Sequence, residues 1–268
     1  MHDGLLDKSD VASAIPDVWL RRYNLYACIL HSVQGTLMLV ASQAVPNIKK
    51  FSKQVTISNL EYNATAKALE PGVPKDAFKL EIGAMAASFL LLSAVAHLIV
   101  LLNFQTYLRD INNGINRVRW YEYALSSSVM ICAIATLFGC YDLGSLILIF
   151  ITNAIMNIFG LFMEKMNPPD RVTTDWSPFW WGCVAGAGPW IVVFLYFLSG
   201  GNFDQIPGFV YGILLSYVFF FNTFPVNMYL QYARVGKWVC TFLPQLPPLA
   251  VSMLLFGRCA AVHRLPTR

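Results

Sequence analysis

The sequence predicts an all-α membrane protein in which transmembrane helices form a bundle. Of its 268 residues, 56% are hydrophobic and only 13% are charged, whereas soluble domains carry roughly 25% charged residues. The mean hydropathy is positive, at +0.52. The apolar residues are gathered into runs of about 20, the length that spans about 30 Å of hydrocarbon. These observations indicate an integral, multi-pass protein whose main partner is the lipid bilayer.

Six transmembrane spans are predicted, each bounded by charges or by clusters of Pro, Gly and Asn. They cover residues 21–42, 83–105, 117–139, 143–163, 178–198 and 208–232. A seventh segment, 238–257, is less regular, because Pro244, Pro247 and Pro248 remove backbone donors and clash with preceding carbonyls. The expected organisation is a polar cytoplasmic segment, a six-helix part, and an atypical seventh segment with a tail, covering 1–20, 21–237 and 238–268 respectively.

Lysine and arginine counts predict that the N-terminus faces the cytoplasm. In this orientation the inner ends of the spans carry Lys8, Arg21, Arg22, Arg109, Arg117, Arg119, Lys165, Arg171, Arg234 and Lys237. The short loops 140–142 and 199–207 contain neither Lys nor Arg and lie outside, as the positive-inside rule requires. The longer loop 43–82 carries six lysines on the outside and runs against the rule.

Loop 43–82 is also the one sizeable extramembrane element. Its segment 54–57 is expected to pair as a short strand. Asn63-Ala64-Thr65 matches the acceptor pattern for N-glycosylation, a triplet that is common by chance.

Four polar positions stand out inside the predicted spans: His31, His97, Glu122 and the serine run 126–128. At about 1.5 Å per helical residue, His31 lies roughly 15 Å, His97 roughly 12 Å and Glu122 roughly 8 Å from the inner boundary. Ser126 lies one turn above Glu122 on the same helix face. Ionisable groups in lipid are costly and face the bundle interior or a wet cavity. We interpret this set as a polar cavity in which Glu122 is a counterion or proton acceptor and the histidines relay protons.

Each of these residues also has a plainer interpretation. A single intramembrane histidine commonly hydrogen-bonds to a neighbouring helix. Glu122 is placed to form an interfacial pair with Arg119, three residues away, whose long side chain can reach the membrane surface. Asn153 and Asn157, one turn apart in the fourth span, are expected to tie helices together.

Aromatic residues are frequent in the last two predicted spans. Trp190, Tyr217 and Phe220 are candidates for the wall of a flat apolar ligand, whereas lipid contact and an aromatic belt explain Trp180 and Trp181 equally well. The six cysteines form no C-x-x-C pair, so no metal site is predicted. There is no H-E-x-x-H, no G-x-S-x-G with a plausible base and no P-loop, so neither an enzyme nor a nucleic-acid partner is expected.

The residues around Glu122 resemble the third helix of the heliorhodopsins. The segment Arg119-Trp120-Tyr121-Glu122-Tyr123 and the following serine run carry this likeness most specifically. Other segments are similar to the first, second, fifth and sixth helices of that family: 21–24 with 31–35, 92–97, 182–186 with 189–190, and 221–222 with 227–232. The resemblance covers about residues 20–237.

This resemblance implies a seven-transmembrane-helix, rhodopsin-like bundle of inverted topology, with a cytoplasmic N-terminus. Family members hold all-trans retinal as a protonated Schiff base on a lysine of the seventh helix. The third-helix glutamate that Glu122 matches is its counterion, and the histidines that His31 and His97 match belong to the polar cavity. The family forms homodimers in which the first extracellular loop takes part. Light sensing through retinal is the function that the resemblance implies.

The sequence departs from the family pattern in the seventh helix. No lysine follows Lys237, which itself lies in the basic loop after the sixth span. Without a lysine amine no imine forms, so retinal is expected to bind noncovalently if it binds. We hypothesise that residues from about 239 onward reflect a shifted reading frame or altered splicing. Two functions stay open: a heliorhodopsin-like light sensor, and a retinal-free membrane protein that acts in binding or assembly on the same scaffold.

Overall fold

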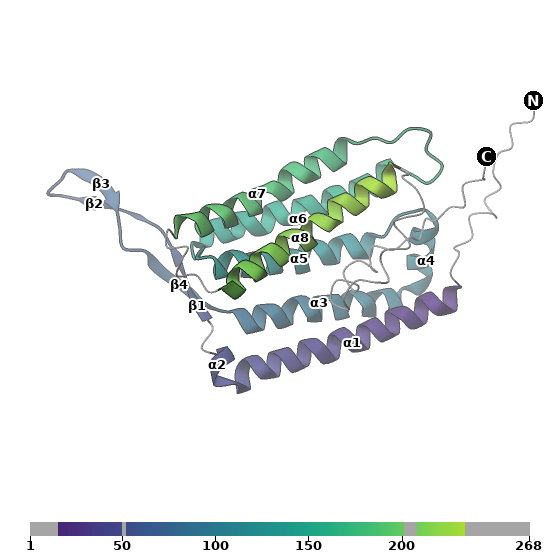
Figure 1. Ribbon diagram of the computed structural model, residues 1–268, viewed down its shortest axis with the longest axis horizontal. Coiled ribbons are helices and arrows are strands. Elements are labelled where there is room, and N and C mark those ends of the chain that lie inside the picture. The colour runs from purple at the N-terminus through teal and green to yellow at the C-terminus, as the bar shows by residue number, and fades with distance from the viewer. Residues whose placement is uncertain (1–15, 50–51, 201–207, 234–268) are drawn as a thin grey trace, which may run out of the picture.

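The computed structural model is a bundle of long helices with a β-ribbon at one end, and it describes residues 16–49, 52–200 and 208–233 (Figure 1). The long helices are α1 (Asp17–Ala44), α3 (Ile82–Leu102), α5 (Arg117–Leu137), α6 (Leu143–Met166), α7 (Ser177–Ser199) and α8 (Gly208–Tyr232). Two short helices, α2 (Pro46–Lys49) and α4 (Phe104–Asn112), follow α1 and α3.

The six long helices coincide with the six predicted spans to within a few residues. By length and composition, five of them can cross a membrane: α1, α3, α6, α7 and α8. Helix α5 is not in this group, and its first two turns contain Arg117, Arg119 and Glu122. The seventh candidate, 238–257, lies outside the described residues, and so does most of the N-terminal segment 1–20.

Helix α5 lies at the centre of the bundle, although it carries Arg117, Arg119 and Glu122. It packs against α3 on one side and α6 on the other, while α1 covers α3 and α7 covers α6. Its C-terminal half forms the main apolar core through Ile131, Ile134 and Ala135, all essentially inaccessible to solvent. Because α5 is enclosed by protein, its polar side chains meet other side chains in place of lipid.

One glycine brings α5 and α6 into close contact. Gly160 of α6 faces the ring of Trp120 on α5, and a Cβ at position 160 would overlap that ring. Small residues at helix interfaces allow this kind of approach in membrane bundles. The start of α5 is therefore fixed against α6 at the level of Trp120, two residues before Glu122.

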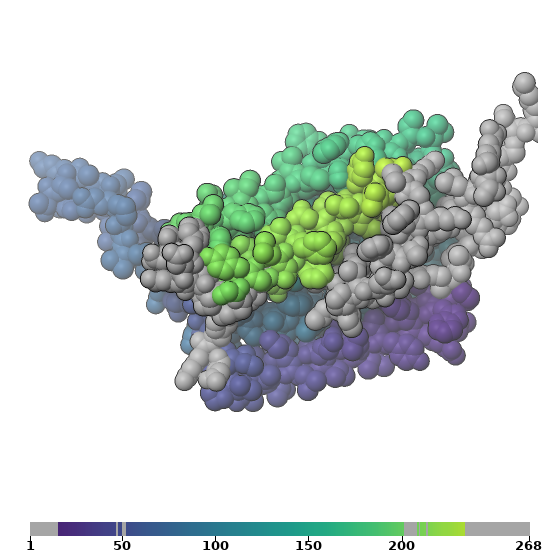
Figure 2. All heavy atoms as spheres, in the orientation of Figure 1, coloured from purple at the N-terminus to yellow at the C-terminus, as the bar shows by residue number. Residues whose placement is uncertain are grey.

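The β-ribbon is formed by loop 43–82. Strand β1 (Ser52–Ile57) pairs antiparallel with β4 (Lys75–Glu81), and β2 (Leu60–Asn63) pairs with β3 (Ala68–Pro71). The predicted strand at 54–57 is thereby confirmed. The base of the ribbon is attached to the α5–α6 turn, where the Thr56 N–H donates to the Tyr141 carbonyl at 2.9 Å. The tip extends well beyond the helices (Figures 1 and 2).

Candidate functional site

Glu122 is buried between α5 and α3, with only 6% of its surface exposed. Its Oε1 accepts a hydrogen bond from the Ser93 hydroxyl of α3 at 2.6 Å. The hydroxyl of Ser126, one turn further along α5, also hydrogen-bonds to it. Hydroxyl groups from two helices therefore satisfy the carboxyl group, as a buried polar group requires.

His31 and His97 lie against each other between α1 and α3. Their rings are stacked, with centroids 5.7 Å apart and planes 13° from parallel. The Nδ1 of His97 shares a hydrogen bond of 2.9 Å with the Asn24 side-chain oxygen of α1. Within the described part of the chain, Nδ1 of His31 is buried and has no hydrogen-bond partner.

Ser93 joins the histidine pair to the acid. Ser93 and His97 are four residues apart on α3, so they share one face of that helix. The structure thus brings the sequence-predicted residues His31, His97, Glu122 and Ser126 into one polar layer across α1, α3 and α5. The sequence reasoning missed Ser93 and Asn24, because serine and asparagine are common in helices and neither carries a charge that marks it.

The alternative interpretations of the polar residues fare differently. The plainer interpretation of an intramembrane histidine, a hydrogen bond to a neighbouring helix, holds for His97, which is hydrogen-bonded to Asn24 of α1. Glu122, by contrast, takes part in no ion pair within the described residues. Its expected partner, Arg119, pairs with Glu164 at the end of α6.

The Arg119–Glu164 pair forms a second polar cluster, closer to the ends of the helices. Both side chains are buried, and Glu164 also accepts the backbone N–H of Asn116 at 2.7 Å. The guanidinium group lies 4.5 Å from the centroid of the Trp120 ring. Sequence reasoning missed this pair because Glu164 is 45 positions from Arg119 and lies beside Lys165 at the predicted end of a span.

The serine run also connects α5 to α6. The Asn153 amide donates to the hydroxyls of Ser127 at 2.7 Å and Ser128 at 3.1 Å. Asn157 donates to Ser127 at 3.0 Å. The predicted tie through Asn153 and Asn157 is present, and it fixes the face of α5 that carries Ser126 and Glu122.

The predicted aromatic residues are divided between two environments. Trp190 of α7 and Tyr217 of α8 both pack against the core around α5, and Trp190 contacts Phe221 edge-on at 5.4 Å. Phe220 contacts its neighbour Phe219 at 5.5 Å. Phe221, which is adjacent to Phe220, is thus the α8 phenylalanine that contacts Trp190.

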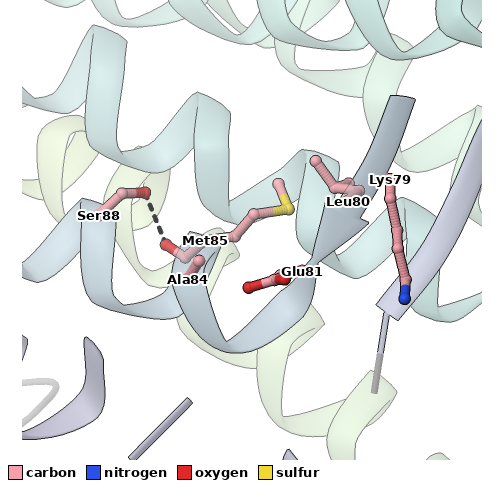
Figure 3. Close-up of a pocket in the computed structure, with 6 residues that line it drawn as sticks. All are labelled: Lys79, Leu80, Glu81, Ala84, Met85 and Ser88. Carbon is pink, nitrogen blue, oxygen red and sulfur yellow. Dashed lines mark hydrogen bonds between the residues drawn. The ribbon is translucent and has the colours of Figure 1, made fainter. Parts of the chain in front are cut away.

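An open hollow of about 400 Å³ lies at the other end of α3 (Figure 3). Its lining residues come from the end of β4 and the first turns of α3: Lys79, Leu80, Glu81, Ala84, Met85 and Ser88. None of these residues belongs to the polar layer, and the nearest, Ser88, is five residues before Ser93, or about 7.5 Å along the helix axis. The hollow is therefore separate from the polar layer around Glu122.

A comparison with protein families agrees with this arrangement. The family described as Heliorhodopsin matches residues 20–243, which include α1, α3, α5, α6, α7 and α8. A search of curated proteins gives no match. The matched segment is most of the chain and contains every residue of the polar layer, so this membrane protein belongs to the heliorhodopsin family.

Proposed function

We propose that this chain is a light-sensing membrane protein built to bind retinal, in which Glu122 occupies the position of the counterion. The observation that carries the proposal is the state of Glu122: it is buried, held by the hydroxyls of Ser93 and Ser126, and outside every ion pair of the described residues. A buried carboxyl group arranged in this way favours a cation placed beside it.

The residues present fit retinal in part. Trp190, Tyr217 and Phe221 supply flat apolar surfaces next to the α5 core, which suit a polyene. The attachment point does not fit, because no described lysine lies within the interior of a long helix. Lys165 is in the last turn of α6, and the other described lysines lie in α2 or the ribbon segment.

The consequence is that this chain, as printed, holds retinal without a covalent bond. Retinal supplies the light-absorbing polyene when it is bound. The residues of the chain contribute the rest: Ser93 and Ser126 orient the Glu122 carboxyl group, and the aromatic side chains of α7 and α8 exclude water. Phe220 and the relay role of His31 and His97 remain predictions within this proposal.

The proposed orientation has the N-terminus in the cytoplasm and the β-ribbon outside. All six arginines of the described residues support it, since they lie at the helix ends opposite the ribbon: Arg21, Arg22, Arg109, Arg117, Arg119 and Arg171. A homodimer that uses the ribbon segment belongs to the same proposal, as an extension from the family.

A retinal-free membrane protein is the second candidate function. The observation that favours it is the absence of a lysine from the interiors of the described long helices. On this alternative the same bundle acts in binding or assembly, and the Glu122 layer serves only to hold α1, α3 and α5 together.

A spectroscopic experiment distinguishes the two functions. The purified protein is mixed first with all-trans retinal and then with the preformed imine of retinal and n-butylamine, which supplies the amine that the helices lack. We expect free retinal to give no visible band sensitive to hydroxylamine, and the protonated imine to bind with a visible band. A hydroxylamine-sensitive visible band with retinal alone would show that a lysine of this chain is used after all.

Substitution of the acid then tests the role of Glu122. An adjacent carboxylate stabilises the protonated imine. In Glu122→Gln the bound imine should therefore lose its proton, and its visible band, at a pH roughly 1–3 units lower than in the wild-type protein. Glu81→Gln, at the outer hollow, is the matched control and should leave this pH unchanged. If the imine does not bind to the wild-type protein, the retinal-free function is the correct one. If it binds with the same pH profile in both proteins, Glu122 is not the counterion.

A further inference from the structure

The turn at the tip of the β-ribbon contains the sequence Asn63-Ala64-Thr65. Asn63 is the last residue of β2 and is half-buried, while residues 64–66 are exposed. The ribbon carries this turn away from the helices into open space (Figures 1 and 2). An acceptor triplet for N-linked glycosylation is meaningful only where an enzyme can reach it, on an exposed loop outside the membrane.

The two faces of the ribbon differ in polarity. In the β2–β3 register, Leu60 faces Pro71 and Tyr62 faces Leu69, so one face is apolar. Glu61 faces Glu70 on the other face, and Asn63 lies on that same face because side chains alternate along a strand. A group attached to Asn63 would therefore extend from the polar face and leave the apolar face uncovered.

The Asn63 side chain is already folded into a compact turn. Its Oδ1 accepts the backbone N–H of Thr65 at 2.9 Å and that of Ala66 at 3.2 Å. Its Nδ2 donates to Glu70 on the neighbouring strand at 2.8 Å. The contact with Glu70 is exposed, so releasing the amide nitrogen from it costs little. The turn ends at Lys67, whose φ of 52° reverses the chain.

From this placement we propose that Asn63 is an acceptor site for N-linked glycosylation. The donor is an oligosaccharide joined to a lipid through pyrophosphate. The Nδ2 of Asn63 forms a bond to the sugar C1 as the bond from C1 to the pyrophosphate oxygen breaks. The lipid pyrophosphate leaves with the bonding electrons, and the amide proton passes to a base of the transferase. No oxidant or reductant is needed, and neither retinal nor Glu122 takes part.

The test uses the full chain expressed in yeast, whose oligosaccharyl transferase acts on the lumenal side of the membrane. We expect a slower-migrating form that a peptide N-glycosidase converts to the faster one, leaving Asp at position 63 in the mass spectrum. Asn63→Gln and Thr65→Ala should each abolish the slow form. Asn59→Gln is the matched control, because Asn59 is on the same ribbon but is followed by Leu60 and Glu61 and forms no triplet.

The orientation of the chain is measured in parallel through protease access to an N-terminal tag in sealed microsomes. A single fast-migrating form overturns the proposal in either orientation. If the N-terminus is cytoplasmic, that result means that the turn is not recognised as an acceptor. If the N-terminus is lumenal, the proposal fails because the ribbon is on the wrong side, whereas the counterion role of Glu122 is unaffected.

Discussion

Glu164→Gln should destabilise the bundle strongly, because it deprives a buried arginine of its carboxylate partner. The side chains of Arg119 and Glu164 are only 8% and 7% exposed. The glutamine keeps one side-chain oxygen, which can accept the Asn116 N–H, while an NH2 group replaces the oxygen that accepts from Arg119. Its effect therefore reports on the ion pair itself.

The magnitude follows from burial. A partly exposed pair contributes about 0–1 kcal/mol, because water and salt screen it. Breaking a buried pair by removing one partner costs about 3–5 kcal/mol, and the low exposure of both side chains places this pair in that class. For a chain of this size the melting temperature should fall by roughly 6–20 °C.

The assay uses the chain's own buried thiols. Cys132 and Cys140 are buried, so a thiol-reactive fluorogenic dye reports their exposure as the detergent-solubilised protein is heated. Asp110→Asn is the matched control, because it removes a partly exposed pair with Arg117 and should shift the transition by no more than about 1 kcal/mol. Equal shifts for Glu164→Gln and Asp110→Asn would refute the reasoning.

Two further predictions concern helix contacts away from the acid. Gly160→Ala should cost about 1–3 kcal/mol in the same thermal assay, because the added Cβ overlaps the Trp120 ring. Gly212→Ala in α8, where a Cβ meets nothing within 4 Å, is the control and should not destabilise; equal losses would contradict this. The Ser145 backbone N–H, donating to Asp142 at the start of α6, holds the pKa of that carboxyl group below its ordinary value of 3.8. The ionised Asp142 carboxylate therefore stabilises the fold at pH values above 3.8. This contribution is lost as the pH falls through the lower pKa that Asp142 has in the folded state. Asp142→Asn should therefore melt below the wild type at pH 6, with the gap closing toward pH 3; a gap independent of pH would exclude this cause.

The helices were predictable from the sequence because hydrocarbon imposes a length. A segment that crosses about 30 Å must be a run of about 20 apolar residues, and such runs are visible without knowledge of their neighbours. The ribbon was predictable only in part, at 54–57, since its pairing with β4 joins segments about 20 residues apart. Short helices such as α4 were not predicted, because nine residues at a membrane surface leave no comparable pattern.

The candidate site was predictable where a charge marked a residue. Glu122, His31 and His97 are conspicuous inside apolar runs, and the depth estimate placed them in one layer. The contacts of that layer depend on helix rotation, which a single sequence does not reveal. The contact of Ser93 with Glu122 is therefore found only when α3 is seen against α5. The contact of Phe221 with Trp190 is likewise found only when α8 is seen against α7.

The pairing of Arg119 explains why Glu122 can serve a ligand. The two residues are three positions apart on α5, close enough for a local ion pair that would neutralise the acid. In the fold, Arg119 is engaged instead by Glu164 of α6, with Trp120 packed against its guanidinium group. Glu122 is left to the hydroxyls of Ser93 and Ser126, which orient its carboxyl group. The structural ion pair thus engages the nearest arginine, and on the proposed function this leaves the Glu122 carboxyl group available to a cationic ligand.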